Sequence, residues 1–133
     1  MQMVVAWITT AIVFAGVDAV WLSQMGPRLY KPVLGEILAP KPDLTAAVIF
    51  YLIYVTGLVL FVVAPALERG GLMKAVVMGA LLGLMAYATY DLTNQATLRV
   101  WDWKITVIDL CWGAFVSAVS CAAAYMIASR VTS

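Results

Sequence analysis

Four stretches of this sequence are long and apolar enough to cross a lipid bilayer, and no other feature constrains the fold as strongly. They cover residues 3–25, 44–67, 72–98 and 105–129. A helix needs about 20 apolar residues to cross a hydrocarbon core roughly 30 Å thick. Because lipid offers the backbone no hydrogen-bond partner, each stretch must satisfy its own N–H and C=O groups as a helix. The sequence therefore predicts one all-α domain over residues 1–133, a polytopic membrane protein with four transmembrane helices in an antiparallel bundle, embedded in the lipid bilayer.

Composition excludes several classes of function. Charged residues make up 11% of the chain, against roughly 25% in soluble domains, so a soluble domain is excluded. The chain has no histidine, which excludes His-ligated haem, the usual mixed zinc sites and imidazole acid–base catalysis. Cys111 and Cys121 lie about 15 Å apart along one predicted helix and cannot form a disulfide with each other. No phosphate-binding loop, cofactor fingerprint or basic patch is present, so we expect no cofactor and no nucleic-acid partner.

The connection between the first two predicted helices is the only one longer than a tight turn. Residues 25–43 hold four of the five prolines, namely Pro27, Pro32, Pro40 and Pro42. Pro32 suits the first position of a helix and Pro40 suits a stop. An apolar stripe accompanies them: Tyr30, Val33, Leu34, Ile37 and Leu38. One interpretation is a short interfacial helix that covers one end of the bundle, and the other is a rigid spacer.

The third stretch contains Gly79 and Gly83, a GxxxG pair. Residues this small let another backbone approach closely, either within the bundle or in a second copy of the chain. The pair therefore predicts a packing seam, and it also offers a contact for a possible homodimer. The same helical face continues into a polar run at residues 87–94.

Three aspartates, Asp18, Asp91 and Asp109, fall inside the predicted helices. Spanning helices alternate in direction, so the end of the first, the end of the third and the start of the fourth share one side of the membrane, here called the long-loop side. At 1.5 Å per residue, the three carboxyl groups lie roughly 6 to 10 Å below that interface. We therefore expect them in one layer, as part of a substrate- or ion-binding site.

Aromatic and polar side chains are expected around this layer. The further candidate binding residues are Trp21, Tyr51, Tyr54, Tyr87, Tyr90, Asn94 and Trp112. The fourth helix carries a stripe of small and polar residues that should face protein instead of lipid: Thr106, Asp109, Gly113, Ser117 and Ser120. The pattern assigns no catalytic or metal-binding role to any of these residues.

All eight basic residues lie in predicted loops or at helix ends, so none is available to pair with the three aspartates. An ionised aspartate inside a membrane costs at least about 2.5 kcal/mol, and neighbouring carboxylates repel each other. We therefore expect at least one or two of the acids to be protonated at neutral pH, or a cation to be bound. The alternative is a structural role, in which a protonated aspartate donates an interhelical hydrogen bond.

The distribution of basic residues predicts an orientation in the membrane. Five of them belong to the long-loop side, Arg28, Lys31, Lys41, Arg99 and Lys104, and three to the other side. The positive-inside rule then places the long-loop side in the cytoplasm and both termini outside.

Four motifs give the chain a family resemblance. They are FAGVDAVWL at residues 14–22, FYLIYVTG at 50–57, AYATYDLTN at 86–94 and DLCWG at 109–113. In these motifs the chain resembles the bacterial membrane-protein family catalogued as domain of unknown function 2177. The resemblance covers nearly the whole chain and implies a multi-pass protein of the bacterial inner membrane. It implies no activity.

Three functions fit these observations. The first is a small proton- or cation-linked transporter or carrier, in which the aspartates bind protons or a cationic solute and the aromatic rings contribute cation–π contacts. The second is a membrane enzyme or lipid-binding protein that acts on a bilayer-derived, lipid-like ligand. The third is a structural or assembly subunit of a membrane complex. The sequence favours the first, for which we expect a homodimer because four helices are few for a transport pathway.

Overall fold

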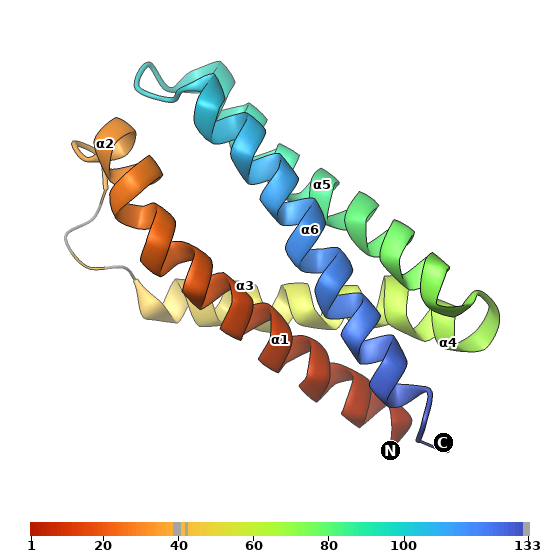
Figure 1. Cartoon of the computed structure of the whole chain (residues 1–133). Coiled ribbons are helices and arrows are strands. Elements are labelled where there is room, and N and C mark those ends of the chain that lie inside the picture. The colour runs from red at the N-terminus through yellow and green to blue at the C-terminus, as the bar shows by residue number, and fades with distance from the viewer. Residues whose placement is uncertain (39–40, 42, 132–133) are drawn as a thin grey trace.

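The computed structural model describes residues 1–38, 41 and 43–131, and these residues form helices joined by short connections (Figure 1). The elements, with π-helical segments labelled η, are α1 Gln2–Met25, η1 Gly26–Tyr30, α2 Lys31–Leu34, α3 Leu44–Leu58, η2 Val59–Val63, α4 Ala64–Arg69, α5 Gly71–Thr97 and α6 Trp103–Ala128. They join into four helices long and apolar enough to span a membrane, Gln2–Leu34, Leu44–Arg69, Gly71–Thr97 and Trp103–Ala128. The described residues contain no strand. The predicted all-α fold with four spanning helices is confirmed.

The helix α6 lies at the centre of the bundle. It packs along α5 on one side and along α1 on the other, and it has more buried residues than any other helix described. The span formed by α3, η2 and α4 crosses the bundle at an angle to α1 (Figure 1). Both termini lie at one end, opposite α2 and the turn between α5 and α6 (Figure 1). Large apolar side chains are exposed on every spanning helix, as expected for a surface in contact with lipid.

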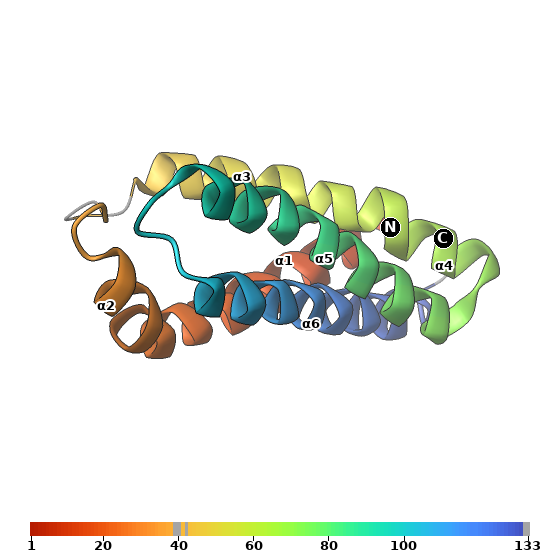
Figure 2. The ribbon, with the colours of Figure 1, turned by 90° about the horizontal axis from the view of Figure 1, so that it is seen from above.

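The first span is longer than predicted, because the helix does not end at Met25. It continues through the π-helical segment η1 and the turn α2 to Leu34, with backbone angles in the right-handed helical region at its junctions. Pro27 has no N–H and would break the regular hydrogen-bond pattern, and a π-turn absorbs this loss. The turn α2 bends away from the α1 axis at the end of the bundle (Figure 2). The short helix predicted to begin at Pro32 is present as α2, Lys31–Leu34, but it follows η1 without a break, and Pro40 lies outside the described residues.

The segment formed by η1 and α2, here called the bent segment, nevertheless covers the end of the bundle on the long-loop side, here called the long-loop end. Leu29 and Leu34 are almost fully buried, at 2% and 3% exposed. They form an apolar cluster with Trp101 and Ile105 at the start of α6. This contact fixes the direction of the segment and brings Tyr30, which lies between the two leucines, over the polar interior.

The second span also continues through its proline. The π-helical segment η2 precedes Pro65, which occupies the first turn of α4. The helix ends at Arg69, and Gly71 follows with a φ of +72°, a conformation that favours glycine. The N-terminal half of α3 is mostly exposed, and its first partly buried side chain is Tyr51.

The predicted glycine seam packs inside the chain. Gly79 and Gly83 are buried against α6, where an added Cβ atom at Gly83 would lie 2.2 Å from the carbonyl oxygen of Gly113. Glycine is required here because the two backbones touch. Since the seam is occupied by α6, it does not supply the contact for the possible homodimer, which would need a different face.

The small and polar stripe on α6 faces protein, as predicted. All five of its residues are buried: Thr106, Asp109, Gly113, Ser117 and Ser120. At the long-loop end, the Trp101 indole N–H donates to Thr106 Oγ1 at 3.1 Å, and Thr106 donates to Gln95 Oε1 at 2.8 Å. The Gln95 amide in turn donates to the Trp101 carbonyl at 3.2 Å. This closed network holds the turn between α5 and α6.

Candidate functional site

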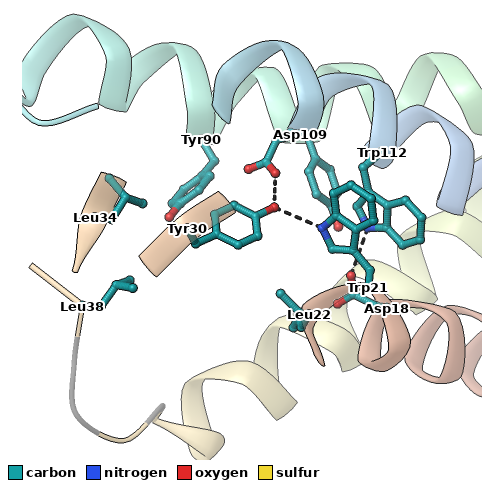
Figure 3. Close-up of a pocket in the computed structure, with 10 residues that line it drawn as sticks. Asp18, Trp21, Leu22, Tyr30, Leu34, Leu38, Tyr90, Asp109 and Trp112 are labelled. Atoms are coloured by element: carbon teal, nitrogen blue, oxygen red, sulfur yellow. Dashed lines mark hydrogen bonds between the residues drawn. The ribbon is translucent and has the colours of Figure 1, made fainter. Parts of the chain in front are cut away.

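A cavity of about 240 Å³ lies at the long-loop end of the bundle, between the bent first span, α5 and α6 (Figure 3). Two carboxyl groups, Asp18 and Asp109, face it. Its other lining residues are Trp21, Leu22, Tyr30, Leu34, Leu38, Tyr87, Tyr90 and Trp112. The structure thus combines two acids with five aromatic rings around one hollow.

The Asp18 carboxyl group accepts two hydrogen bonds from different helices. The Trp112 indole N–H on α6 donates to Asp18 Oδ1 at 3.1 Å, and the Tyr51 hydroxyl on α3 donates to Asp18 Oδ2. Asp18 itself is only 7% exposed and lies on a buried face of α1 that also includes Ala6, Thr10 and Phe14. Asp18 therefore joins three helices, and both of its oxygens are oriented by donors.

The Asp109 carboxyl group is held by the bent segment of the first span. The Tyr30 hydroxyl donates to Asp109 Oδ1 and accepts a hydrogen bond of 3.1 Å from the Trp21 indole N–H (Figure 3). Asp109 is 5% exposed. Because Tyr30 uses both of its hydrogen-bonding capacities, its position depends on α1 and α6 together.

The indoles of Trp21 and Trp112 connect the two carboxyl groups. Their rings are stacked, with centroids 4.2 Å apart and planes inclined by 9° (Figure 3). The N–H of Trp21 points to the Tyr30 and Asp109 pair, whereas the N–H of Trp112 points to Asp18. The faces of these rings and the neighbouring tyrosines offer electron-rich surfaces of the kind that attract cations.

Asp91 is the most deeply buried of the three acids, at 0% exposed. Its side chain lies close enough to Asp109 for the two carboxyl groups to interact. Neither Asp91 oxygen has a hydrogen-bond partner among the described residues. Asp91 is not one of the residues that line the cavity.

The remaining predicted residues divide into two groups. Tyr87 and Tyr90 line the cavity, and Tyr90, at 58% exposed, also contacts Trp101 edge to face. Tyr54 points elsewhere, because its hydroxyl lies 2.7 Å from Ser117 Oγ in the apolar core. Asn94 is partly buried near Tyr90 and is not a lining residue.

Sequence reasoning did not include Tyr30 among the candidate site residues. The sequence predicts Tyr30 only as part of the apolar stripe of the connection, with Val33, Leu34, Ile37 and Leu38. Its position between two prolines, Pro27 and Pro32, could have indicated a bend toward the bundle. The contact with Asp109 spans 79 residues of sequence and has no local signal.

The ionisable side chains with a formal charge that line the cavity are acidic, namely Asp18 and Asp109. None of the described residues that line the cavity is basic. Within residues 1–38, 41 and 43–131, no group of three or more His, Cys, Asp or Glu side chains is arranged to hold a metal ion. The arrangement can therefore stabilise carboxylates by hydrogen bonds from Trp and Tyr, and it leaves their negative charge available to a mobile cation or a proton.

Comparisons with known proteins identify the family and nothing more specific. Searches of curated proteins and of solved structures found no match to this chain. A family model described as "Predicted membrane protein (DUF2177)" matches residues 3–126, which is nearly the full length and agrees with the motif resemblance. The chain therefore belongs to this family of membrane proteins.

Proposed function

We propose that this membrane protein is a carrier of small organic cations, with protons as the exchanged ion. The observation that carries the proposal is the cavity in which Asp18 and Asp109 face five aromatic rings and no basic side chain. Hydrogen bonds from Trp112, Tyr51 and Tyr30 orient the two carboxyl groups without neutralising them. An ammonium group would supply the missing positive charge.

The walls and size of the cavity support an organic cation in preference to a bare metal ion. Each cation–π contact is worth about 0.5 to 2 kcal/mol, depending on desolvation, and the stacked indoles present such faces. The volume of about 240 Å³ corresponds to roughly eight water molecules at about 30 Å³ each. This suits a quaternary ammonium compound with a short side chain, such as choline, which serves here as a probe.

The apolar groove on the lipid-facing side supports the second candidate, a lipid-binding protein or membrane enzyme. This groove, of about 270 Å³, is lined by Phe50, Ala86, Tyr87 and Tyr90. Tyr87 and Tyr90 also line the polar cavity, so a ligand with a hydrocarbon tail could reach it from the bilayer. Lipid that copurifies with the protein, and is lost when Ala86 is replaced by Phe, would favour this candidate.

The first test compares two probes of nearly equal shape. Choline and its uncharged analogue 3,3-dimethylbutan-1-ol are titrated into the protein in nanodiscs by isothermal calorimetry. We expect choline to bind at least tenfold more tightly, and Asp18→Asn or Asp109→Asn to remove this preference. The control Glu36→Gln removes an exposed carboxyl group near the same end and should change nothing. Equal binding of the two probes would contradict a cation site.

The second test measures transport. Proteoliposomes with an acidic lumen are supplied with labelled choline, and uptake is compared with that of liposomes at equal pH on both sides. We expect uptake to depend on the pH gradient and to be lost in Asp109→Asn. Full activity of the well-folded Asp18→Asn and Asp109→Asn variants would reject the carrier and point to a structural role for the acids.

A further inference from the structure

Contacts between α5 and α6 follow one register from Gly79 to Gln95. Three glycines mark this register, because a Cβ atom added to each would touch the other helix. Gly79 on α5 lies against Cys121 on α6, Gly83 against Ser117, and Tyr87 against Gly113, so each contact is four residues further along both helices. Beyond the polar layer, Gln95 is bonded to Thr106. Four residues beyond the contact of Tyr87 with Gly113, and before that of Gln95 with Thr106, the register pairs Asp91 with Asp109. The register therefore places the two carboxyl groups opposite each other across the helix interface.

The surroundings of the two carboxyl groups differ. Asp109 faces the cavity and accepts a hydrogen bond from Tyr30. Asp91 is fully buried, and neither of its oxygens has a partner among the described residues. Without a positive charge close by, a buried carboxylate that has no hydrogen-bond donor is costly to ionise, and two adjacent carboxylates are costly to ionise together. A single proton, carried by Asp91 and directed to Asp109, would relieve both problems.

We infer that Asp91 and Asp109 share one proton, and that binding of an organic cation at Asp109 releases this proton. The inference rests on the proposed function and adds the two residues that hold and release the exchanged proton at the same site. The charge balances: the O–H bond of Asp91 breaks, the proton leaves to water, and the ammonium group replaces its positive charge. Each cation bound is thus matched by one proton released.

Several other groups face the pair and bear on its protonation. From the first span these are Asp18 and Tyr30, and from α5 they are Tyr87 and Tyr90. Trp21 and Trp112 are donors only and do not titrate in this range. Asp18 in turn accepts hydrogen bonds from Tyr51 on α3 and Trp112 on α6.

Infrared spectroscopy tests the shared proton directly. The C=O band of a protonated carboxylic acid is recorded at pH 7 in wild type and in Asp91→Asn. We expect the band in wild type and its loss in Asp91→Asn, whose amide can donate to Asp109 in place of the proton. Glu36→Gln should keep the band. If Asp91→Asn does not fold, a choline-minus-buffer difference spectrum of wild type decides the matter, because it should show the loss of one protonated carboxyl group.

Isothermal calorimetry of choline binding is repeated in two buffers that differ in ionisation enthalpy. The difference between the two observed binding enthalpies gives the number of protons released per choline bound. We expect about one in wild type and about zero in Asp91→Asn, with affinity rising about tenfold per pH unit only in wild type. Choline binding without proton release would overturn this inference and leave the cation site standing. If no cation binds at all, the proposed function and the exchange step both fail, while the infrared band still decides whether Asp91 and Asp109 share a proton.

Discussion

Replacing Gly83 with alanine should destabilise the bundle, although alanine normally favours a helix. The new Cβ atom would lie 2.2 Å from the Gly113 carbonyl oxygen and 2.6 Å from Ser117 Oγ. Ordinary contacts of this kind begin at 3.4 Å, and a backbone carbonyl cannot rotate away as a side chain can. The helices α5 and α6 must therefore move apart by about 1 Å, which loosens contacts along the seam on both sides of the substitution.

The size of the effect follows from two opposing contributions. Removing glycine from a helix interior gains roughly 0.5 to 1 kcal/mol. Overpacking a tight interface costs roughly 1 to 3 kcal/mol, and the backbone contact places Gly83 at the upper end of this range. We expect a net loss of about 2 to 2.5 kcal/mol in the free energy of unfolding, which lowers the folding equilibrium constant about thirty- to seventyfold.

Reversible unfolding in mixed detergent micelles, followed by circular dichroism, measures this loss. Gly16→Ala is the matched control, because an added Cβ atom there meets nothing within 4 Å. It should be neutral or stabilising by a few tenths of a kcal/mol. Gly79→Ala, with contacts of 3.1 to 3.2 Å, should fall between the two. If Gly83→Ala and Gly16→Ala have the same stability, the close approach of α5 and α6 is refuted.

Two further predictions concern the long-loop end. Tyr30→Phe keeps the ring but removes the hydroxyl that donates to Asp109, and should lower the free energy of unfolding by about 1 kcal/mol in the same assay; an unchanged value would mean that this hydrogen bond does not form. Asp102→Ala removes the side chain that accepts a hydrogen bond from the first turn of α6, at a cost of about 1 kcal/mol, whereas Asp102→Asn should retain most of the stability. Equal losses in both Asp102 variants would exclude capping as the cause.

Helix positions and the buried stripe of α6 could be predicted because they depend on composition and period. A continuous stretch of about 20 apolar residues in lipid must satisfy its backbone hydrogen bonds as a helix, so hydropathy is sufficient to locate the spanning helices. The stripe that contains Asp109, Gly113 and Ser117 follows from helical spacing alone. Alternation of helix direction was enough to bring Asp18 and Asp109 to the same end.

The first bend could not be predicted in the same way. Pro27 indicates a helix end in most sequences, but here a π-turn carries the helix onward. The direction of the bent segment is decided by Leu29 and Leu34, which pack against Trp101 and Ile105 far along the chain. Local sequence does not encode such contacts, and the position of Tyr30 in the site depends on them.

The stacked indoles have a consequence for spectroscopy. Trp21 and Trp112 lie 4.2 Å apart and nearly parallel, so their electronic transitions should couple and give an exciton signal in circular dichroism. Among the aromatic pairs in the described part of the chain, this is the one formed by two tryptophans. Because both rings line the cavity, a ligand that separates or tilts them should change the signal. The protein thus contains an intrinsic optical reporter of cavity occupancy that requires no added label.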